Sequence, residues 1–202
     1  MRTMTRRLAL ASGFAVAVMA LPAAAGAGPL DHPGATRTLV CAACHGQGGN
    51  SQSSAMPIIA GMDAGYFKKQ IENYATGKRV SAEMEPYAKQ VRELGVDDIA
   101  SYFAAQKREP TPIKPDAAAV ARGRTVAAAC VLCHGENGRG DLAKGIPSLA
   151  GQAPGFLAEQ MTLFKQDRRN PGDATLAAVK ALMKTIPDAT FADLAAYYSG
   201  LR

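Results

Sequence analysis

Large aromatic side chains are scarce in this sequence. Its 202 residues include no tryptophan, and phenylalanine and tyrosine together make up 6% of them. Hydrophobic residues still reach 48%, which is ordinary for a soluble globular protein. The chain can therefore bury a core, but if it divides into two halves each core is small. A large buried cofactor would supply apolar volume that these side chains lack.

Long apolar runs are also missing, with one exception at the N-terminus. Three arginines among the first seven residues precede an apolar run over residues 8–21, and small residues after it offer an Ala-x-Ala cleavage site. This order is typical of a secretory signal peptide, which we assign to residues 1–25 with cleavage near residues 25–27. An uncleaved membrane anchor is the alternative, but the run is shorter than the ~20 apolar residues of a transmembrane helix. We expect export to the periplasm.

The sequence gives no support to nucleic-acid binding or to common enzyme classes. Its formal net charge is +6, but three of these charges lie in the predicted signal peptide. The other basic residues are scattered, without a stripe or interleaved aromatic residues. No Ser-His-Asp pattern, phosphate-binding glycine loop or HExxH motif is present. We expect neither a nucleic-acid partner nor an enzyme active site built from side chains.

The rest of the chain repeats itself. The first unit covers residues 28–108 and the second covers residues 117–202, with a proline-rich linker over residues 109–116. Cys41 matches Cys130 at a separation of 89 residues. Pairs that match at a separation of 90 residues include Pro57 and Pro147, Gly61 and Gly151, Gln70 and Gln160, Tyr74 and Phe164, and Arg79 and Arg169. Two such units predict a duplicated domain.

Each unit is expected to be helical. Apolar residues are spaced for one helical face over residues 66–74 and again over residues 156–164. Closing helices are expected to begin near Asp97 and near residues 188–190, where residue types suit helix starts. No segment shows the alternation of a strand. The sequence predicts an all-α fold.

Both units contain the same cysteine motif. It reads Cys41-Ala-Ala-Cys44-His45 in the first unit and Cys130-Val-Leu-Cys133-His134 in the second. Cys-x-x-Cys-His is the attachment pattern of haem c. Two thiols three positions apart lie on one side of a helical turn, where they can form thioethers with the two vinyl groups of a porphyrin edge. The sequence therefore predicts two covalently bound haem c groups, with His45 and His134 as iron ligands.

Other uses of paired cysteines fit less well. Four cysteines in an exported chain would usually form two disulfides, but disulfides do not explain a histidine after each pair. A thioredoxin-like redox pair needs a βαβ setting, which the sequence lacks. Zinc sites rarely require a histidine directly after each cysteine pair in two separate units.

With these residues identified, the chain resembles the two-haem cytochromes of the cytochrome c4 type. The resemblance covers about residues 39–201 and rests on both haem motifs and on the helical segment 66–79. In the second unit, residues 147–152 are the clearest match. The resemblance implies two tandem all-α class I cytochrome c domains, joined by the proline-rich linker, with their haem edges close together.

The sixth iron ligand in such proteins is usually a methionine thioether, which raises the reduction potential. In the first unit, Met84 stands where the family pattern requires it. In the second unit the matching window, residues 174–179, contains no methionine, and the nearest candidate is Met183. Otherwise the second haem is five-coordinate, or it uses a different ligand such as Lys180.

The resemblance also implies supporting roles. Pro57 and Pro147 are expected beside the two histidines, where nearby backbone fixes each imidazole ring. Arg79 and Arg169 are expected to pair with haem propionates. The alternative for both arginines is a solvated helix end.

We expect a periplasmic electron carrier and not an enzyme. The resemblance points to a respiratory role between a quinol-oxidising complex and a terminal oxidase or reductase, and any membrane association would run through these partners. One alternative is the haem subunit of a dehydrogenase complex with a flavin or sulfur-oxidising partner. Another, motivated by the missing methionine, is a second haem that binds a small molecule or reduces peroxide.

Overall fold

The computed structural model describes residues 31–202. The predicted signal peptide, residues 1–25, lies outside the described residues. Within residues 31–202 every regular element is helical, and extended pairing is limited to two isolated bridges. None of the helices in this part is long and apolar enough to cross a bilayer. The all-α prediction is confirmed.

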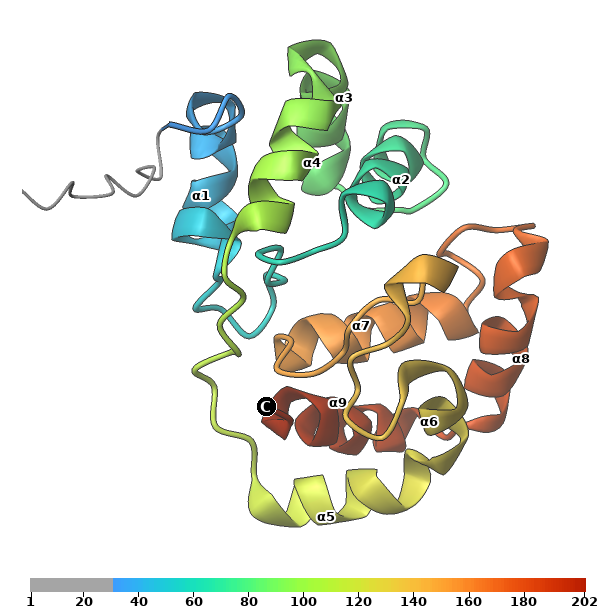
Figure 1. Ribbon diagram of the computed structural model, residues 1–202. Coiled ribbons are helices and arrows are strands. Elements are labelled where there is room, and N and C mark those ends of the chain that lie inside the picture. Colours follow the sequence, from blue (N-terminus) through green and yellow to red (C-terminus); the bar gives the residue numbers. More distant parts are fainter. Residues whose placement is uncertain (1–30) are drawn as a thin grey trace, which may run out of the picture.

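The helices form two units joined by an irregular segment (Figure 1). The first unit contains α1 (Leu39–His45), α2 (Ala64–Ala75), α3 (Met84–Leu94) and α4 (Val96–Ala105). The second unit contains α5 (Ala117–Val126), α6 (Ala128–His134), α7 (Pro154–Lys165), α8 (Ala177–Thr185) and α9 (Phe191–Gly200). Short 3-10 turns lie at Thr36–Thr38, Gln47–Gly49, Leu142–Lys144, Ala174–Leu176 and Asp188–Thr190. The expected closing helices are α4 and α9, and each begins within a residue of its expected start.

Several helix ends are set by residues suited to those positions. Asp63 accepts a hydrogen bond from the Tyr66 backbone N–H at 2.7 Å and so caps the start of α2. Asp116 caps α5 in the same way, through the Ala119 N–H at 2.8 Å. Pro154 occupies the first turn of α7, where its missing N–H costs nothing. The local sequence therefore determines where α2, α5 and α7 begin.

Each unit has its own hydrophobic core. The first core is built around Phe67, Ile99 and Phe103, and all of its buried members lie between residues 35 and 103. The second core is built around Leu157 and Leu194, and all of its buried members lie between residues 127 and 198. Because the clusters share no residue, the two units pack as separate domains that then meet at an interface.

A glycine lets the N-terminal segment of each unit cross the closing helix closely. A Cβ on Gly34 would lie 2.2 Å from the Asp98 carbonyl oxygen, and one on Gly123 would lie 2.0 Å from the Asp193 carbonyl oxygen. Real Cβ atoms do not approach oxygen so closely, so no side chain larger than hydrogen fits at either crossing. The crossing holds the segment that leads into each haem motif against the closing helix.

The two units meet with the turn after α2 beside the turn after α7. Arg79 and Arg169 form an isolated antiparallel bridge there. The Asn170 backbone N–H donates to the Lys78 carbonyl oxygen at 2.6 Å. Residues 79 and 169 are partners in the repeat, so the interface has an approximate twofold character. Figure 1 shows α2 and α7 on the facing sides of the two units.

The glycine crossing generates a test of the fold. Gly123→Ala should lower the free energy of unfolding by about 1–3 kcal/mol, because overpacking a tight contact forces the backbone to shift. Gly200→Ala is the matched control, since a Cβ on Gly200 in α9 meets only ordinary contacts at 3.4 Å and beyond. Denaturant titration of both holo-variants measures the difference. Equal stabilities would show that the close crossing is not needed.

Candidate haem sites

Each cysteine motif lies on a short helix that ends at its histidine. The backbone leaves α1 at Gly46 with φ 74° and leaves α6 at Gly135 with φ 73°. This left-handed region favours glycine, so each helix stops directly after its histidine. In both motifs the first cysteine is half-buried and the second is exposed, and none of the four forms a disulfide. The described residues contain no group of three or more His, Cys, Asp and Glu side chains placed to hold a metal ion by themselves.

A proline carbonyl group fixes each histidine ring. His45 Nδ1 lies 2.8 Å from the Pro57 carbonyl oxygen, and His134 Nδ1 lies 3.0 Å from the Pro147 carbonyl oxygen. With the proton on Nδ1 donated to the carbonyl, Nε2 is left with its lone pair for a metal. Burial lowers the pKa of both imidazoles, which favours this neutral form. The expected placement of both prolines beside the histidines is confirmed.

A cavity opens beside the first motif. It has an empty volume of about 1050 Å³, which includes space open to solvent. Cys41, Cys44, His45 and Met84 all line it. Most of the remaining wall is apolar and comes from α2, α3 and the loop before α2, including Met56, Pro57, Ile59, Phe67, Ile71, Tyr74 and Val91. Part of the wall comes from α7 of the second unit, namely Phe156, Glu159 and Gln160.

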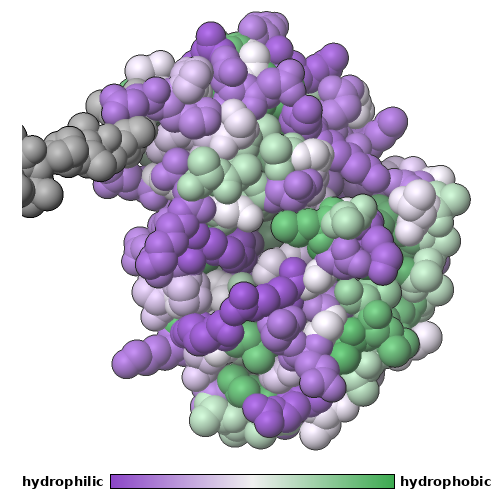
Figure 2. Space-filling view, viewed as in Figure 1, coloured by the Kyte–Doolittle hydropathy of each residue, from purple (hydrophilic) through white to green (hydrophobic). Residues whose placement is uncertain are grey.

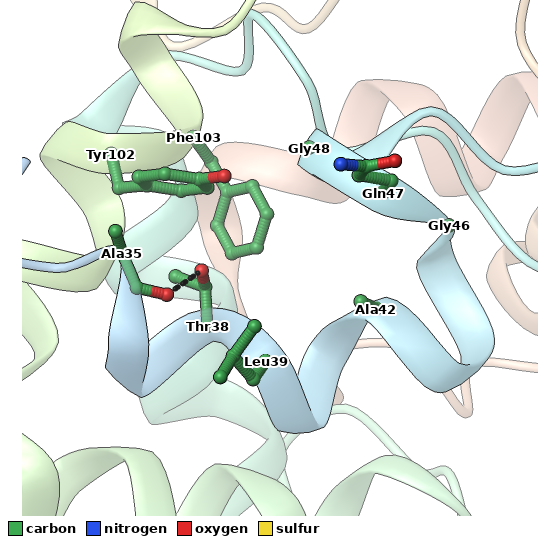
Figure 3. A pocket seen from close by; sticks show the side chains of 9 residues that line it. All are labelled: Ala35, Thr38, Leu39, Ala42, Gly46, Gln47, Gly48, Tyr102 and Phe103. Atoms are coloured by element: carbon green, nitrogen blue, oxygen red, sulfur yellow. Dashed lines mark hydrogen bonds between the residues drawn. The ribbon is translucent and has the colours of Figure 1, made fainter. Parts of the chain in front are cut away.

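The opposite face of α1 packs on the closing helix. A smaller pocket there is lined by Leu39 and Ala42 from α1 and by Tyr102 and Phe103 from α4 (Figure 3). Thr38 donates its hydroxyl to the Ala35 carbonyl oxygen at 2.7 Å at the rim of this pocket. The helix that carries the first motif therefore has this pocket and the closing helix on one side. Its cysteines and histidine face the larger cavity on the other side.

The second unit differs on the side where the sixth ligand was expected. The window 174–179, which lacks methionine, forms a 3-10 turn and the first residues of α8. Met183 lies further along α8, is 6% exposed, and belongs to the core cluster against which Cys130 packs. Apolar surface gathers on the side of the second unit where α8 lies (Figure 2). Met183 and Cys130 therefore share one cluster, as Met84 and Cys41 do in the first unit.

Lys180, named from the sequence as another ligand, is already engaged. Its Nζ lies 2.6 Å from Asp167 Oδ1 and donates to the Asn170 carbonyl oxygen. The side chain is buried. Binding iron would require Lys180 to leave both partners and lose its proton, so this arrangement disfavours it as a ligand.

Two buried arginines meet between the units. Arg79 is 4% exposed and Arg169 is 8% exposed, so the alternative of solvated helix ends is wrong. Arg79 donates to Gln70 at 2.7 Å and to Gln160 at 2.6 Å. Arg169 donates to Gln160 at 2.9 Å and to the Tyr66 hydroxyl at 2.9 Å. These bonds cross the interface in both directions.

The arginine pair carries positive charge, and Glu159 acts electrostatically on Arg79 without forming an ion pair with it. Neither guanidinium forms an ion pair among the described residues, and the buried Nε of each has no hydrogen-bond partner there. Burial, together with the neighbouring Arg169, lowers the pKa of Arg79 to about 10, so Arg79 stays charged at neutral pH. Buried cations are normally paired. Neither arginine lines the first cavity, although Gln160, which accepts from both, does. Their pairing with haem propionates stays a prediction.

The described residues thus fit two haem c groups, with two thiols and one oriented imidazole in each unit. When bound, each haem supplies a reversible one-electron couple of its iron. Two tandem helical units with such sites define a dihaem c-type cytochrome.

Comparison with known proteins identifies the family. The cytochrome c family model matches residues 120–201. The chain is 32% identical over 176 residues to cytochrome c4 of Pseudomonas aeruginosa, covering 83% of this chain and 87% of that protein. It is 30% identical over 154 residues to the thiosulfate dehydrogenase electron acceptor of Stutzerimonas stutzeri, covering 67% and 68%. The structure of reduced recombinant cytochrome c4 from Pseudomonas stutzeri matches with a TM-score of 0.74 at 27% identity, covering 83% of this chain and 96% of that chain.

The chain belongs to the cytochrome c4 family. It carries two covalently bound c-type haems, and it is an electron-transfer protein. The prediction of two haem c groups and the expectation of an electron-transfer protein are confirmed.

Sequence reasoning missed the residues that act across the interface. Glu159 and Gln160 line the first cavity from the second unit, and Gln152 reaches into the loop beside His45. Gln160 was matched with Gln70 in the repeat, but its spacing gave no hint of a role in the other unit. Contacts between the units depend on how they dock, and the spacing of residues within each unit does not show this.

Proposed function

We propose that the chain is a periplasmic carrier that moves electrons between a quinol-oxidising complex and a terminal oxidase or reductase. The signal-like pattern in residues 1–25 supports export. The observation that carries the proposal is the shared boundary of the two units: α7 of the second unit forms part of the wall of the first cavity. Two redox centres on either side of such a boundary suit short-range electron exchange within one chain.

The attachment residues follow from the two motifs. Cys41 and Cys44 form the thioethers of the first haem, with His45 as its iron ligand. The corresponding residues in the second unit are Cys130, Cys133 and His134. The proline hydrogen bond to each Nδ1 supports these roles, since it aims a neutral Nε2 away from the loop.

The sixth ligands are Met84 in the first unit and Met183 in the second. Met84 lines the same cavity as Cys41 and His45, at the start of α3. Met183 lies in the cluster that Cys130 packs against, and the ion pair of Lys180 disfavours the other ligand named from the sequence. The protein's role is to hold, orient and shield both iron centres.

Removing each methionine tests these assignments. Met84→Ala should lower the reduction potential of one haem and leave both haems attached, because a thioether ligand favours reduced iron. Met183→Ala should do the same to the other haem. Spectropotentiometric titration measures both potentials.

Two further methionines serve as controls for the loss of core volume. Met62 packs against the first core and Met161 against the second, and neither is assigned to iron. Alanine at these positions should destabilise the fold and leave the potentials nearly unchanged. If Met183→Ala behaves like Met161→Ala, and carbon monoxide binds to half of the haem in the wild-type protein, the second site is open. The small-molecule or peroxide hypothesis then gains support.

The buried arginines should hold the haem propionates and favour reduced iron through their charge. Arg79→Met should lower the potential of the nearer haem by an amount of order 1 kcal/mol, because a partly buried charge acts at an effective dielectric constant of about 20. Lys78→Met removes the same charge from an exposed neighbour and should have a smaller effect. Equal shifts in the two variants, seen by titration, would contradict a propionate role for Arg79.

A specific observation supports a second partner class. One relative is named as a thiosulfate dehydrogenase electron acceptor, and the similarity covers about two thirds of each chain. The chain could therefore take electrons from a sulfur-oxidising dehydrogenase, as a freely diffusing acceptor or as a subunit of the complex.

An electron-exchange assay tests the proposed function. The reduced holo-protein, purified as a monomer, should be oxidised in air by washed membranes of its source organism, and cyanide should stop this oxidation. Rapid reduction by a purified thiosulfate dehydrogenase with thiosulfate would identify the donor class. Failure to exchange electrons with membranes, together with stable co-purification with a catalytic chain, would instead favour the dehydrogenase-subunit alternative.

A further inference from the structure

A glutamine side chain of the second unit makes two hydrogen bonds to the backbone of one residue in the first. Gln152 is 3% exposed, and its Oε1 accepts a hydrogen bond from the Ile58 N–H at 2.7 Å. Its Nε2 donates to the Ile58 carbonyl oxygen at 2.9 Å. The Ala153 N–H donates to the same Oε1 at 2.9 Å, which fixes the amide from its own side. The side-chain amide is thus satisfied and buried, and it has one orientation.

The Ile58 N–H, which donates to Gln152, belongs to the peptide group that orients His45. Residues 57 and 58 share one planar, conjugated amide, whose carbonyl oxygen is that of Pro57 and whose N–H is that of Ile58. His45 Nδ1 donates to this carbonyl oxygen. The hydrogen bonds therefore form a chain that runs from Gln152 Oε1 through the peptide group to the imidazole.

A chain of this kind changes the strength of its members. A hydrogen bond accepted from the amide N–H polarises the peptide group and makes its carbonyl oxygen a better acceptor, by about 10–30% per bond. A stronger acceptor draws the Nδ1 proton of His45 further from the ring. The imidazole then becomes a more basic ligand, which stabilises oxidised iron relative to reduced iron.

Among the described residues, no side chain of the first unit makes the corresponding pair of hydrogen bonds to the second unit. Gln152 matches Met62 at the repeat separation of 90 residues. Met62 packs against the core of its own unit. A thioether is only a weak acceptor and has no proton to donate, so it cannot make the paired bonds of an amide. The two histidines thus have the same proline contact with different support behind it.

We propose that Gln152 is a positioning residue of the second unit that tunes the reduction potential of the first haem through the Pro57–Ile58 peptide group and His45. The inference rests on the proposed role of His45 as an iron ligand. It makes the docking of the two units part of the first site, and it gives the two haems different potentials by a means other than their sixth ligands.

Substitution of Gln152 in the full-length holo-protein tests the proposal. Gln152→Met installs the residue type found at the matching position of the first unit and removes both bonds to Ile58. The first haem should become easier to reduce, with its reduced-to-oxidised ratio at a fixed potential rising about threefold to tenfold, where tenfold is ~59 mV for a one-electron couple. The second haem should not shift. The nuclear magnetic resonance signal of the His45 Nδ1 proton should move in the direction of a weaker hydrogen bond.

Two other variants separate tuning from loss of stability. Gln152→Glu keeps an oxygen that accepts from the Ile58 N–H, so the His45 Nδ1 proton signal should not move in the direction of a weaker hydrogen bond. Its added negative charge lowers the potential by a Coulomb effect of its own, so this variant is scored by the proton signal. Gln106→Leu removes an amide that donates to the Tyr102 carbonyl oxygen at 3.0 Å, outside the Pro57–Ile58 peptide group. It should leave both potentials in place.

The outcomes distinguish this inference from the proposed function. If Gln152→Met shifts neither haem, or shifts both equally, the tuning role is wrong. A shift in Met84→Ala would show that the ligand assignment of the first haem nevertheless stands, and electron exchange with membranes would show the same for the carrier role. If Gln152→Met unfolds the interface, Gln152→Glu and the Nδ1 proton signal still decide the question, because a signal that moves in the direction of a weaker hydrogen bond in a folded Gln152→Glu protein would contradict the hydrogen-bond chain.

Discussion

The hydrogen bond between each histidine Nδ1 and a proline carbonyl oxygen is the interaction on which both sites depend. It selects the tautomer, fixes the ring and leaves Nε2 for iron, and it joins the helix of the motif to the loop that follows. The glycine that ends each motif helix lets the chain turn back so that this loop reaches the ring. Closing helices and glycine crossings then hold the motif in place from behind.

The interface adds a second constraint, because it places two charged guanidinium groups out of water without a carboxylate in ion-pair contact. Glutamine and tyrosine side chains satisfy part of their hydrogen-bonding capacity, and the buried Nε atoms have no partner among the described residues. Such a buried pair is costly when left unpaired. If the haem propionates approach these groups, as we propose, the docking of the domains depends on the haems, and the proposed role of Gln152 extends this dependence to the histidine of the first unit.

Much of the fold and of the attachment chemistry could be predicted from the sequence. Cys41-Cys44-His45 and its repeat give the cofactor, and the matched pairs at a separation of 90 residues give the duplicated helical units. The burial of Arg79 and Arg169 could not be predicted, because an arginine after a helix is ordinarily solvated. The hydrogen bonds between Gln152 and Ile58 could not be predicted either, since they join residues 94 positions apart across a domain boundary. Met183 stays a prediction, because α8 is displaced relative to the motif pattern of the first unit.

The central claim is that one chain holds two reversible haem centres of unequal character. A coulometric titration of the purified full-length protein tests this most directly, with haem counted on the same sample. The account predicts two haems per chain, two electrons taken up reversibly per chain, and two waves at different potentials. One electron per chain, or two haems that titrate as a single wave with identical spectra, would contradict it.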